Sequence, residues 1–156
     1  GRRQRQMCIR DSPYHYNIVF NLFTSFGYFN TAKENQEALV ALATNLKPGG
    51  VLVLDFMNCT KVVESLPTSE EKEVGGVVFH IDKKVIGENI VKTIVFEDKG
   101  KNHRYEEKVR IISKERFESF FKAAGLSIEH TFGDYELSNF DIESSDRLIF
   151  IARKDD

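Results

Sequence analysis

One stretch near the start of the sequence gathers polar and aromatic side chains of the kind that hold a small ligand. The apolar run Asn17–Leu22 (NIVFNL) is followed directly by Phe23–Asn30 (FTSFGYFN). The first run is typical of a strand buried on both faces, and open α/β sheets bind ligands where their strands end. The residues at that end which could contact a ligand are Asn21, Leu22, Phe23, Thr24, Phe26, Tyr28 and Phe29.

These positions also have ordinary structural explanations. Asn21 could cap the loop, and Phe23 could belong to the core. Phe26, Tyr28 and Phe29 are harder to explain in this way, because three aromatic residues in a loop do not form a helical stripe. Aromatic faces attract cations, so these three residues are candidates for the wall of a site that takes a cationic ligand.

Three further candidates lie elsewhere in the chain. Asp55 and Asn58 lie at the end of a second apolar run, Val51–Phe56 (VLVLDF), and Tyr135 opens a long loop before the last apolar run. Short polar side chains at a strand end can bind a substrate, although Asp and Asn also commonly cap turns. The loop that begins near Tyr135 could approach the same ligand.

The sequence contains no familiar nucleophile, phosphate or metal motif. It lacks G-x-S-x-G and G-x-x-x-x-G-K-[ST], which disfavours hydrolases of the nucleophile-elbow type and phosphate-loop enzymes. The four histidines show no spacing typical of metal ligands, and Cys59 stands alone. We therefore predict no metal site.

The first two apolar runs are linked by a predicted helix. Thr31–Glu34 (TAKE) has the capping-box pattern, and leucines then recur at helical spacing as far as Leu46. Lys47–Gly50 (KPGG) ends the helix, because proline cannot continue it. A strand, a helix and a second strand predict two parallel strands joined by a right-handed crossover.

The remaining elements are predicted in three groups. Cys59–Val74 is expected to be irregular. Val77–Lys84, Asn89–Glu97 and His103–Ser113 alternate with period two and predict a three-stranded antiparallel meander. Ser113 should then cap a helix, and its phenylalanine stripe is expected in the core. The last two predicted strands are Leu126–Phe132 and Arg147–Arg153, with Arg147 pairing with an acid at the surface.

Taken together, NIVFNLFTSFGYF, LKPGG and VLVLDFMN resemble the second half of a class I S-adenosylmethionine-dependent methyltransferase. The resemblance implies an α/β fold: the last strands of a seven-stranded, partial Rossmann-like sheet, with an antiparallel insertion at 76–113. It implies S-adenosylmethionine as the cofactor and a small-molecule acceptor, and transfer from a sulfonium to an amine depends mainly on positioning. The implied cofactor contacts are Asn21, Leu22, Phe23 and Thr24. The implied acceptor contacts are Phe26, Tyr28, Phe29, Asp55, Asn58 and Tyr135.

Residues 1–12 (GRRQRQMCIRDS) differ in composition from the rest. Arg2–Asp11 can be back-translated into a sequence that resembles the transposase adapter of shotgun sequencing libraries; the alternative is a native basic arm. We treat 1–12 as non-native and 13–156 as the methyltransferase part. The family's Gly-rich loop and ribose-binding acid are missing, so we expect about 90 further residues upstream and an inactive 156-residue chain.

Composition limits the other possibilities. With 156 residues, 41% of them hydrophobic, the chain can form one domain with a core. Its net charge of −2 argues against a nucleic-acid partner, and no apolar run is long enough to span a membrane. Two cysteines and no signal peptide predict a cytoplasmic protein. The alternatives are a non-catalytic ligand- or protein-binding α/β module and a different nucleotide-binding enzyme, such as a dehydrogenase; nothing in the sequence specifies an oligomeric state.

Overall fold

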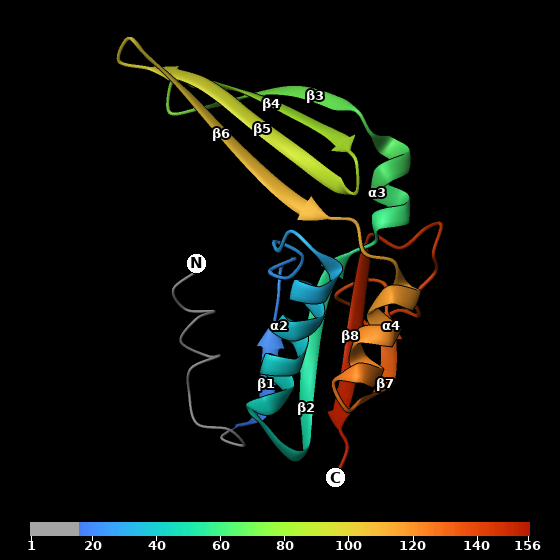
Figure 1. Ribbon diagram of the computed structural model, residues 1–156. Coiled ribbons are helices and arrows are strands. Elements are labelled where there is room, and N and C mark those ends of the chain that lie inside the picture. Colours follow the sequence, from blue (N-terminus) through green and yellow to red (C-terminus); the bar gives the residue numbers. More distant parts are fainter. Residues whose placement is uncertain (1–15) are drawn as a thin grey trace.

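The computed structural model describes residues 16–156 and contains two four-stranded sheets. The adapter-like segment 1–12 lies outside the described residues. Sheet A has the strand order β1-β2-β8-β7, and sheet B has the order β3-β4-β5-β6 (Figure 1). The helices and strands are β1 (Tyr16–Asn21), α2 (Ala32–Thr44), β2 (Leu46–Met57), α3 (Cys59–Ser65), β3 (Thr68–Val74), β4 (Val77–Ile86), β5 (Asn89–Asp98), β6 (Lys101–Arg110), α4 (Lys114–Ala123), β7 (Leu126–Phe132) and β8 (Arg147–Lys154).

The predicted strand–helix–strand unit is confirmed, since β1 runs parallel to β2 with α2 between them. The backbone N–H of Glu34 donates to Thr31 Oγ1 at 3.1 Å, so Thr31 caps α2 as its pattern predicts. The strand β2 begins at Leu46, earlier than expected, because Lys47–Gly50 forms a bulge in its pairing with β1. Glycine is required at Gly50, where a Cβ would lie 2.8 Å from the Lys47 carbonyl oxygen.

The hydrophobic core lies between one face of sheet A and the helices α2 and α4. Phe56 and Phe150 point to this face from β2 and β8, and Phe117 of α4 contacts both, with ring centroids 5.1 and 5.4 Å away. Leu39 of α2 is fully buried in the same cluster. Both helices therefore cover the same side of sheet A.

The expectation that the first strand is buried on both faces is wrong. Ile18 is 51% exposed and Phe20 is 62% exposed, whereas Val19 packs on the core. The physical reason is that β1 is the edge of sheet A among residues 16–156, with α2 and α4 both on its Val19 side.

Sheet B differs from the predicted three-stranded meander. The segment expected to be irregular forms the helix α3 and a fourth strand, β3, which pairs antiparallel with β4. Every residue of β3 is exposed, and its residues 68–73 are all charged or hydroxylated. An edge strand of this kind has no apolar alternation, which is why its sequence pattern did not reveal it.

Sheet B lies beyond the ends of β1 and β2 at which the candidate loop is found (Figure 1). The backbone N–H of Arg110 donates to the Gly27 carbonyl at 2.8 Å, joining β6 to that loop. The strand predicted to reach Ser113 ends at Arg110, because Ser113 Oγ caps α4 by accepting from the Arg116 N–H at 3.1 Å. Sheet B is therefore attached beside the end of sheet A where we expected a ligand.

Candidate ligand-binding site

The loop that follows β1 contains two consecutive residues with left-handed backbones. Phe23 has φ +58° and Thr24 has φ +53°. Neither residue is glycine, and each such conformation costs on the order of 1–3 kcal/mol. Just before them, the Leu22 carbonyl accepts the Ser25 N–H at 3.2 Å and closes the turn. The predicted cofactor contacts Leu22, Phe23 and Thr24 thus form one tight, strained turn at the end of β1.

The carboxylate of Asp55 holds this turn from the end of β2. Asp55 is 1% exposed, and its Oδ2 accepts the Phe23 backbone N–H at 2.8 Å. Its backbone carbonyl accepts the Thr24 N–H at 3.1 Å. Arg147, the first residue of β8, donates from Nε to Asp55 Oδ1 at 2.9 Å and from a terminal nitrogen to Thr24 Oγ1 at 2.8 Å. Asp55 thus joins the loop to β2 and β8.

Tyr135 comes to the same carboxylate from the loop between β7 and β8. Its hydroxyl donates to Asp55 Oδ2 at 2.8 Å. Burial, and then the hydrogen bond to Asp55, raise the pKa of Tyr135 above its usual value, so the phenol keeps its proton. The Tyr135 ring lies edge-on to the Phe23 ring at 6.4 Å, and the Arg147 guanidinium lies 5.8 Å from the ring centre.

Asn21 carries a buried oxygen that has no hydrogen-bond partner. It is the last residue of β1, and its Oδ1 is one of two buried side-chain atoms without a partner within the described range. The other is Oδ1 of Asn35, a residue of α2. Buried amide oxygens are normally paired, so an unpaired one needs an explanation such as an absent ligand or water.

The three aromatic residues predicted to wall an acceptor site lie in different environments. Phe26 is 2% exposed and contacts Phe117, with ring centroids 5.7 Å apart. It is part of the hydrophobic core, and its role in an acceptor site stays a prediction. Tyr28 is 37% exposed and Phe29 is 43% exposed, so these two present aromatic surface.

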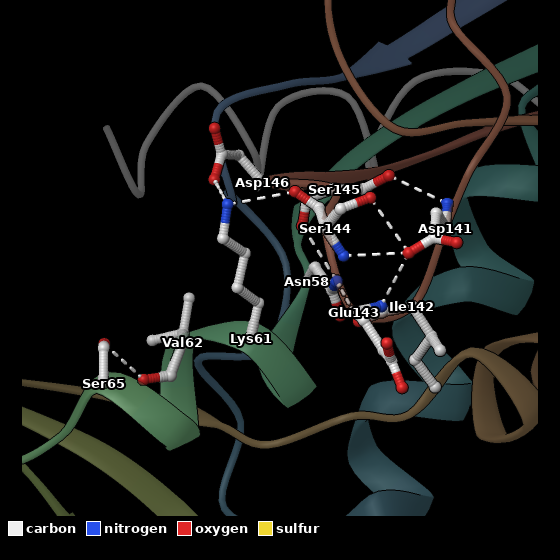
Figure 2. A network of polar contacts seen from close by, with 10 residues as sticks. All are labelled: Asn58, Lys61, Val62, Ser65, Asp141, Ile142, Glu143, Ser144, Ser145 and Asp146. Atoms are coloured by element: carbon white, nitrogen blue, oxygen red, sulfur yellow. Dashed lines mark hydrogen bonds and ion pairs between the residues drawn. The ribbon is translucent and has the colours of Figure 1, made fainter.

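Asn58 holds the loop that carries Tyr135. Its side-chain amide donates to the carbonyls of Ile142 and Ser145, both at 2.8 Å, as Figure 2 shows. It is 2% exposed, so both of its donors are committed within the protein. Lys61 reinforces the contact by donating to the Ser144 carbonyl at 3.0 Å. The assignment of Asn58 to acceptor binding stays a prediction.

The same loop is also organised by its own aspartates. Asp134 accepts the backbone N–H groups of Glu136 and Ser138 at 3.0 Å each, and Asp141 accepts that of Ser144 at 2.9 Å. Hydrogen bonds from the serine amides are the main reason that the pKa of each carboxyl lies below its usual value. These turns give the loop a fixed shape that places Tyr135 against Asp55.

Arg147 is the residue of this site that sequence reasoning placed elsewhere. We expected it to pair with an acid at the surface, but its partner Asp55 is buried. The two residues are 92 positions apart in the chain. The available signal was the strand order: β8 runs antiparallel to β2, so its first residue lies at the end of β2 where Asp55 is found.

Metal and thiol chemistry elsewhere among residues 16–156 can be examined separately from this site. No group of three or more His, Cys, Asp or Glu side chains there could hold a metal ion. Burial raises the pKa of the Cys59 thiol to about 11, which makes it a poor nucleophile near neutral pH. In this part of the chain, no helix combines the length and the apolar character needed to cross a membrane.

The comparisons with solved structures define the class of the fold. An S-adenosylmethionine-dependent methyltransferase from Clostridium acetobutylicum superposes with a TM-score of 0.79 at 17% identity, over 90% of this chain and 59% of its own. The methyltransferase CcbJ from Streptomyces caelestis gives 0.76 at 18% identity, over 91% and 58%. The α/β fold is therefore that of these methyltransferases.

A curated relative agrees with that class. The dTDP-3-amino-3,4,6-trideoxy-alpha-D-glucopyranose N,N-dimethyltransferase of Streptomyces venezuelae is 28% identical over 126 residues, which are 76% of this chain and 53% of the relative. The chain thus spans about half the length of that enzyme. No protein-family model matches the chain. The resemblance to class I S-adenosylmethionine-dependent methyltransferases predicted from the sequence is confirmed.

Proposed function

We propose that the chain is part of an enzyme that transfers a methyl group from S-adenosylmethionine to an amine nitrogen of a small molecule. The curated relative is named for an N,N-dimethyltransferase of an amino sugar nucleotide. A neighbour with a TM-score of 0.63 is described as an amino pentose methyltransferase bound to S-adenosylmethionine. We therefore propose an amino sugar as the acceptor class. The activity is proposed for the whole protein.

The observation that carries the proposal is the unpaired Oδ1 of Asn21. A buried carbonyl oxygen requires a donor, and the ammonium group of an amino acid is a strong one. Asn21 lies at the carboxyl end of β1, which is the end of a strand where α/β folds bind ligands. We assign this oxygen to the methionine end of the cofactor, with Leu22, Phe23 and Thr24 forming the adjacent turn.

The exposed rings of Phe23 and Tyr135 suit the positive charge that is transferred in this reaction. Phe23 is 74% exposed and Tyr135 is 59% exposed, and the two rings contact each other. Aromatic faces attract the sulfonium of the cofactor and the positive charge that develops on the amine nitrogen as it is methylated. When bound, S-adenosylmethionine would supply an electrophilic methyl group. The neutral amine would form the new N–C bond as the C–S bond breaks, S-adenosylhomocysteine would leave as a neutral thioether, and the methylated nitrogen would release its proton to water. The work of the protein is to orient the two partners and exclude water.

In this proposal the acceptor lies beside Tyr135, Tyr28 and Phe29. Asp55 contributes by fixing Phe23 and Tyr135 rather than by moving a proton, since its carboxylate already accepts three donors. Phe26 and Asn58 stabilise the segments that carry these residues. Phe26 anchors the loop after β1 in the core, and Asn58 donates hydrogen bonds to the loop that carries Tyr135. A neutral amine needs little acid–base assistance in a displacement of this kind, so positioning carries the catalysis.

The test uses the whole protein, of which this chain is proposed to be a part, and S-adenosylmethionine with a labelled methyl group. We expect label to enter a dTDP-amino sugar and not the matching sugar in which a hydroxyl replaces the amine. Asn21→Ala should weaken S-adenosylhomocysteine binding roughly 10- to 100-fold, because a hydrogen bond to a charged group contributes about 1.5–3 kcal/mol.

Asn35→Ala is the matched control, because it removes the other unpaired buried oxygen among the described residues from a helix rather than from the strand end. It should leave S-adenosylhomocysteine affinity unchanged. Equal losses in the two variants would remove the assignment of Asn21 to the cofactor. Failure of the native protein to bind S-adenosylhomocysteine or to label any amine would overturn the proposed function.

A further inference from the structure

The turn at Phe23 and Thr24 is held in a conformation that its own residues disfavour. Two adjacent non-glycine residues have φ near +55°, where the Cβ of an L-residue crowds the backbone. Such a turn persists only where the surrounding structure compensates for its cost. The compensation must come from contacts that would be lost if either residue moved to a negative φ.

The contacts that reach this turn from other parts of the fold converge on two residues, Asp55 and Arg147. The N–H groups of Phe23 and Thr24 both donate to Asp55, one to its side chain and one to its backbone. Arg147 closes the arrangement, because its guanidinium reaches Asp55 Oδ1 with one nitrogen and Thr24 Oγ1 with another. Asp55 is 1% exposed and the Arg147 side chain 21%, so the pair is shielded from water.

We propose that Arg147 and Asp55 are positioning residues that hold Phe23 and Thr24 in the left-handed conformation in which the turn receives the cofactor. The inference rests on the proposed function for the identity of that ligand. The specific feature is that the Arg147 guanidinium makes two hydrogen bonds at once. It links the side chain of Thr24 to the carboxylate that also accepts the Phe23 N–H. The turn is preformed, and binding then does not have to supply the cost of ordering it.

The chemistry of the fork predicts that lysine cannot replace Arg147. A lysine ammonium is a single point of charge, whereas the guanidinium presents several N–H groups in a fixed plane. Lysine would keep the charge beside Asp55 and lose one of the two partners. A buried carboxylate would still be neutralised in Arg147→Lys, so this variant should fold while the turn loosens.

The experiment measures amide hydrogen exchange of Phe23 and Thr24 by NMR in the full chain. In Arg147→Lys and Arg147→Gln we expect exchange at both amides to rise about tenfold or more, while the amides of Leu52 and Leu54 in β2 stay protected. The matched control is Arg153→Gln. Arg153 lies on the same strand and also forks, to the Glu129 carboxylate and to the Gly49 carbonyl, but at the opposite end.

Thr24→Gly provides a rescue that a general loss of packing would not show. Glycine adopts positive φ without strain, so the double variant Arg147→Gln with Thr24→Gly should regain protection at the Phe23 amide. If exchange at Phe23 and Thr24 is unchanged in both Arg147 variants, the proposal is wrong. It is also wrong if glycine restores nothing, or if Arg153→Gln opens the same turn.

A binding measurement separates this inference from the proposed function. In the whole protein, Arg147→Lys should raise the KM for S-adenosylmethionine more than the KM for the acceptor. If the turn opens as expected but the native protein binds no S-adenosylhomocysteine, the cofactor assignment fails and the positioning role stands. If the cofactor binds equally well when the turn is open, the positioning role fails.

Discussion

The buried carboxylate of Asp55 is stabilised by hydrogen bonds from its neighbours. Its carboxylate accepts a backbone N–H, a phenol and a guanidinium, and these come from three separate parts of the chain. A buried carboxylate without such partners would cost several kcal/mol. The same three bonds orient Phe23, Tyr135 and Arg147 around one point. At this site the group that neutralises charge is also the group that sets geometry.

Tyr135 gives a spectroscopic handle on this arrangement. Its pKa is raised by burial and by the hydrogen bond to Asp55, so the stabilising contact is fully present below the usual tyrosine pKa and is lost as pH rises through the raised value. In an ultraviolet titration of phenol ionisation, we expect one tyrosine to ionise late. Tyr135→Phe should remove that late step.

Tyr105→Phe is the control for this titration, because Tyr105 is 57% exposed on sheet B and outside the network. It should lower the total absorbance change and leave the late step in place. A titration of Tyr135→Phe that still shows the late step would contradict the hydrogen bond to Asp55.

Among the secondary-structure elements, the loop between β1 and α2 is held at its beginning and at its middle. Asp55 and Arg147 hold its beginning, and Gly27 packs its middle against the core and accepts the Arg110 N–H of β6. Gly27 has φ +88°, and a Cβ there would lie 3.0 Å from the Phe56 ring. The glycine therefore allows the loop to lie directly on the core while it contacts sheet B.

Gly27→Ala should destabilise the chain for two separate reasons. Positive φ costs about 1–2 kcal/mol for a residue with a Cβ, and the contact with Phe56 adds roughly 1–3 kcal/mol of overpacking. Gly75→Ala isolates the first cost, because Gly75 has φ +59° and a Cβ there would have no neighbouring atom within 4 Å. Urea denaturation followed by circular dichroism would give both values. Equal losses of unfolding free energy would show that the close packing at Gly27 has no energetic weight.

The helices that could be predicted from the sequence are those with one buried apolar face and one exposed polar face. The helices α2 and α4 were found because their apolar residues repeat on one face and Thr31 and Ser113 cap them. By contrast, α3 is only seven residues long and β3 is exposed throughout, so neither carries a period to detect. Burial on one face is what makes an element visible in a sequence.

The sequence could predict which segments meet at the candidate site, but it could not predict which side chains pair there. The strand ends gave Asn21, Asp55 and the loop near Tyr135, because parallel strands bring their ends to one edge. The pairing of Asp55 with Arg147 depends on β8 lying next to β2, which joins residues 92 positions apart. The left-handed turn at Phe23 is set by those tertiary contacts, and its residue types alone favour other conformations.

At the scale of the whole molecule, sheet A is covered on one side only among residues 16–156. By register, Phe20 of β1 lies beside Val53 of β2, which lies beside Ile151 of β8, on the face opposite α2 and α4. Phe20 is 62% exposed. An edge strand with apolar residues on an open face tends to associate with other chains.

We expect the chain to self-associate through β1 in a concentration-dependent way. Phe20→Lys should shift sedimentation toward the monomer, since a charge on an edge strand opposes pairing. Val40→Lys is the control, because Val40 is also exposed, at 39%, but lies on α2 rather than on β1. Analytical ultracentrifugation at several concentrations would distinguish the variants. Indistinguishable behaviour of Phe20→Lys and the parent chain would exclude β1 as the contact.

The far turns of sheet B make this protein open to redesign. The turns at Gly75-Gly76 and Lys99-Gly100 have no neighbouring atoms within 4 Å of the positions where their glycines would carry a side chain. Seven residue pairs align β3 with β4, and ten align β5 with β6. A peptide epitope or a fluorescent label could therefore be spliced into either turn, far from Asp55, and report on the molecule without disturbing it.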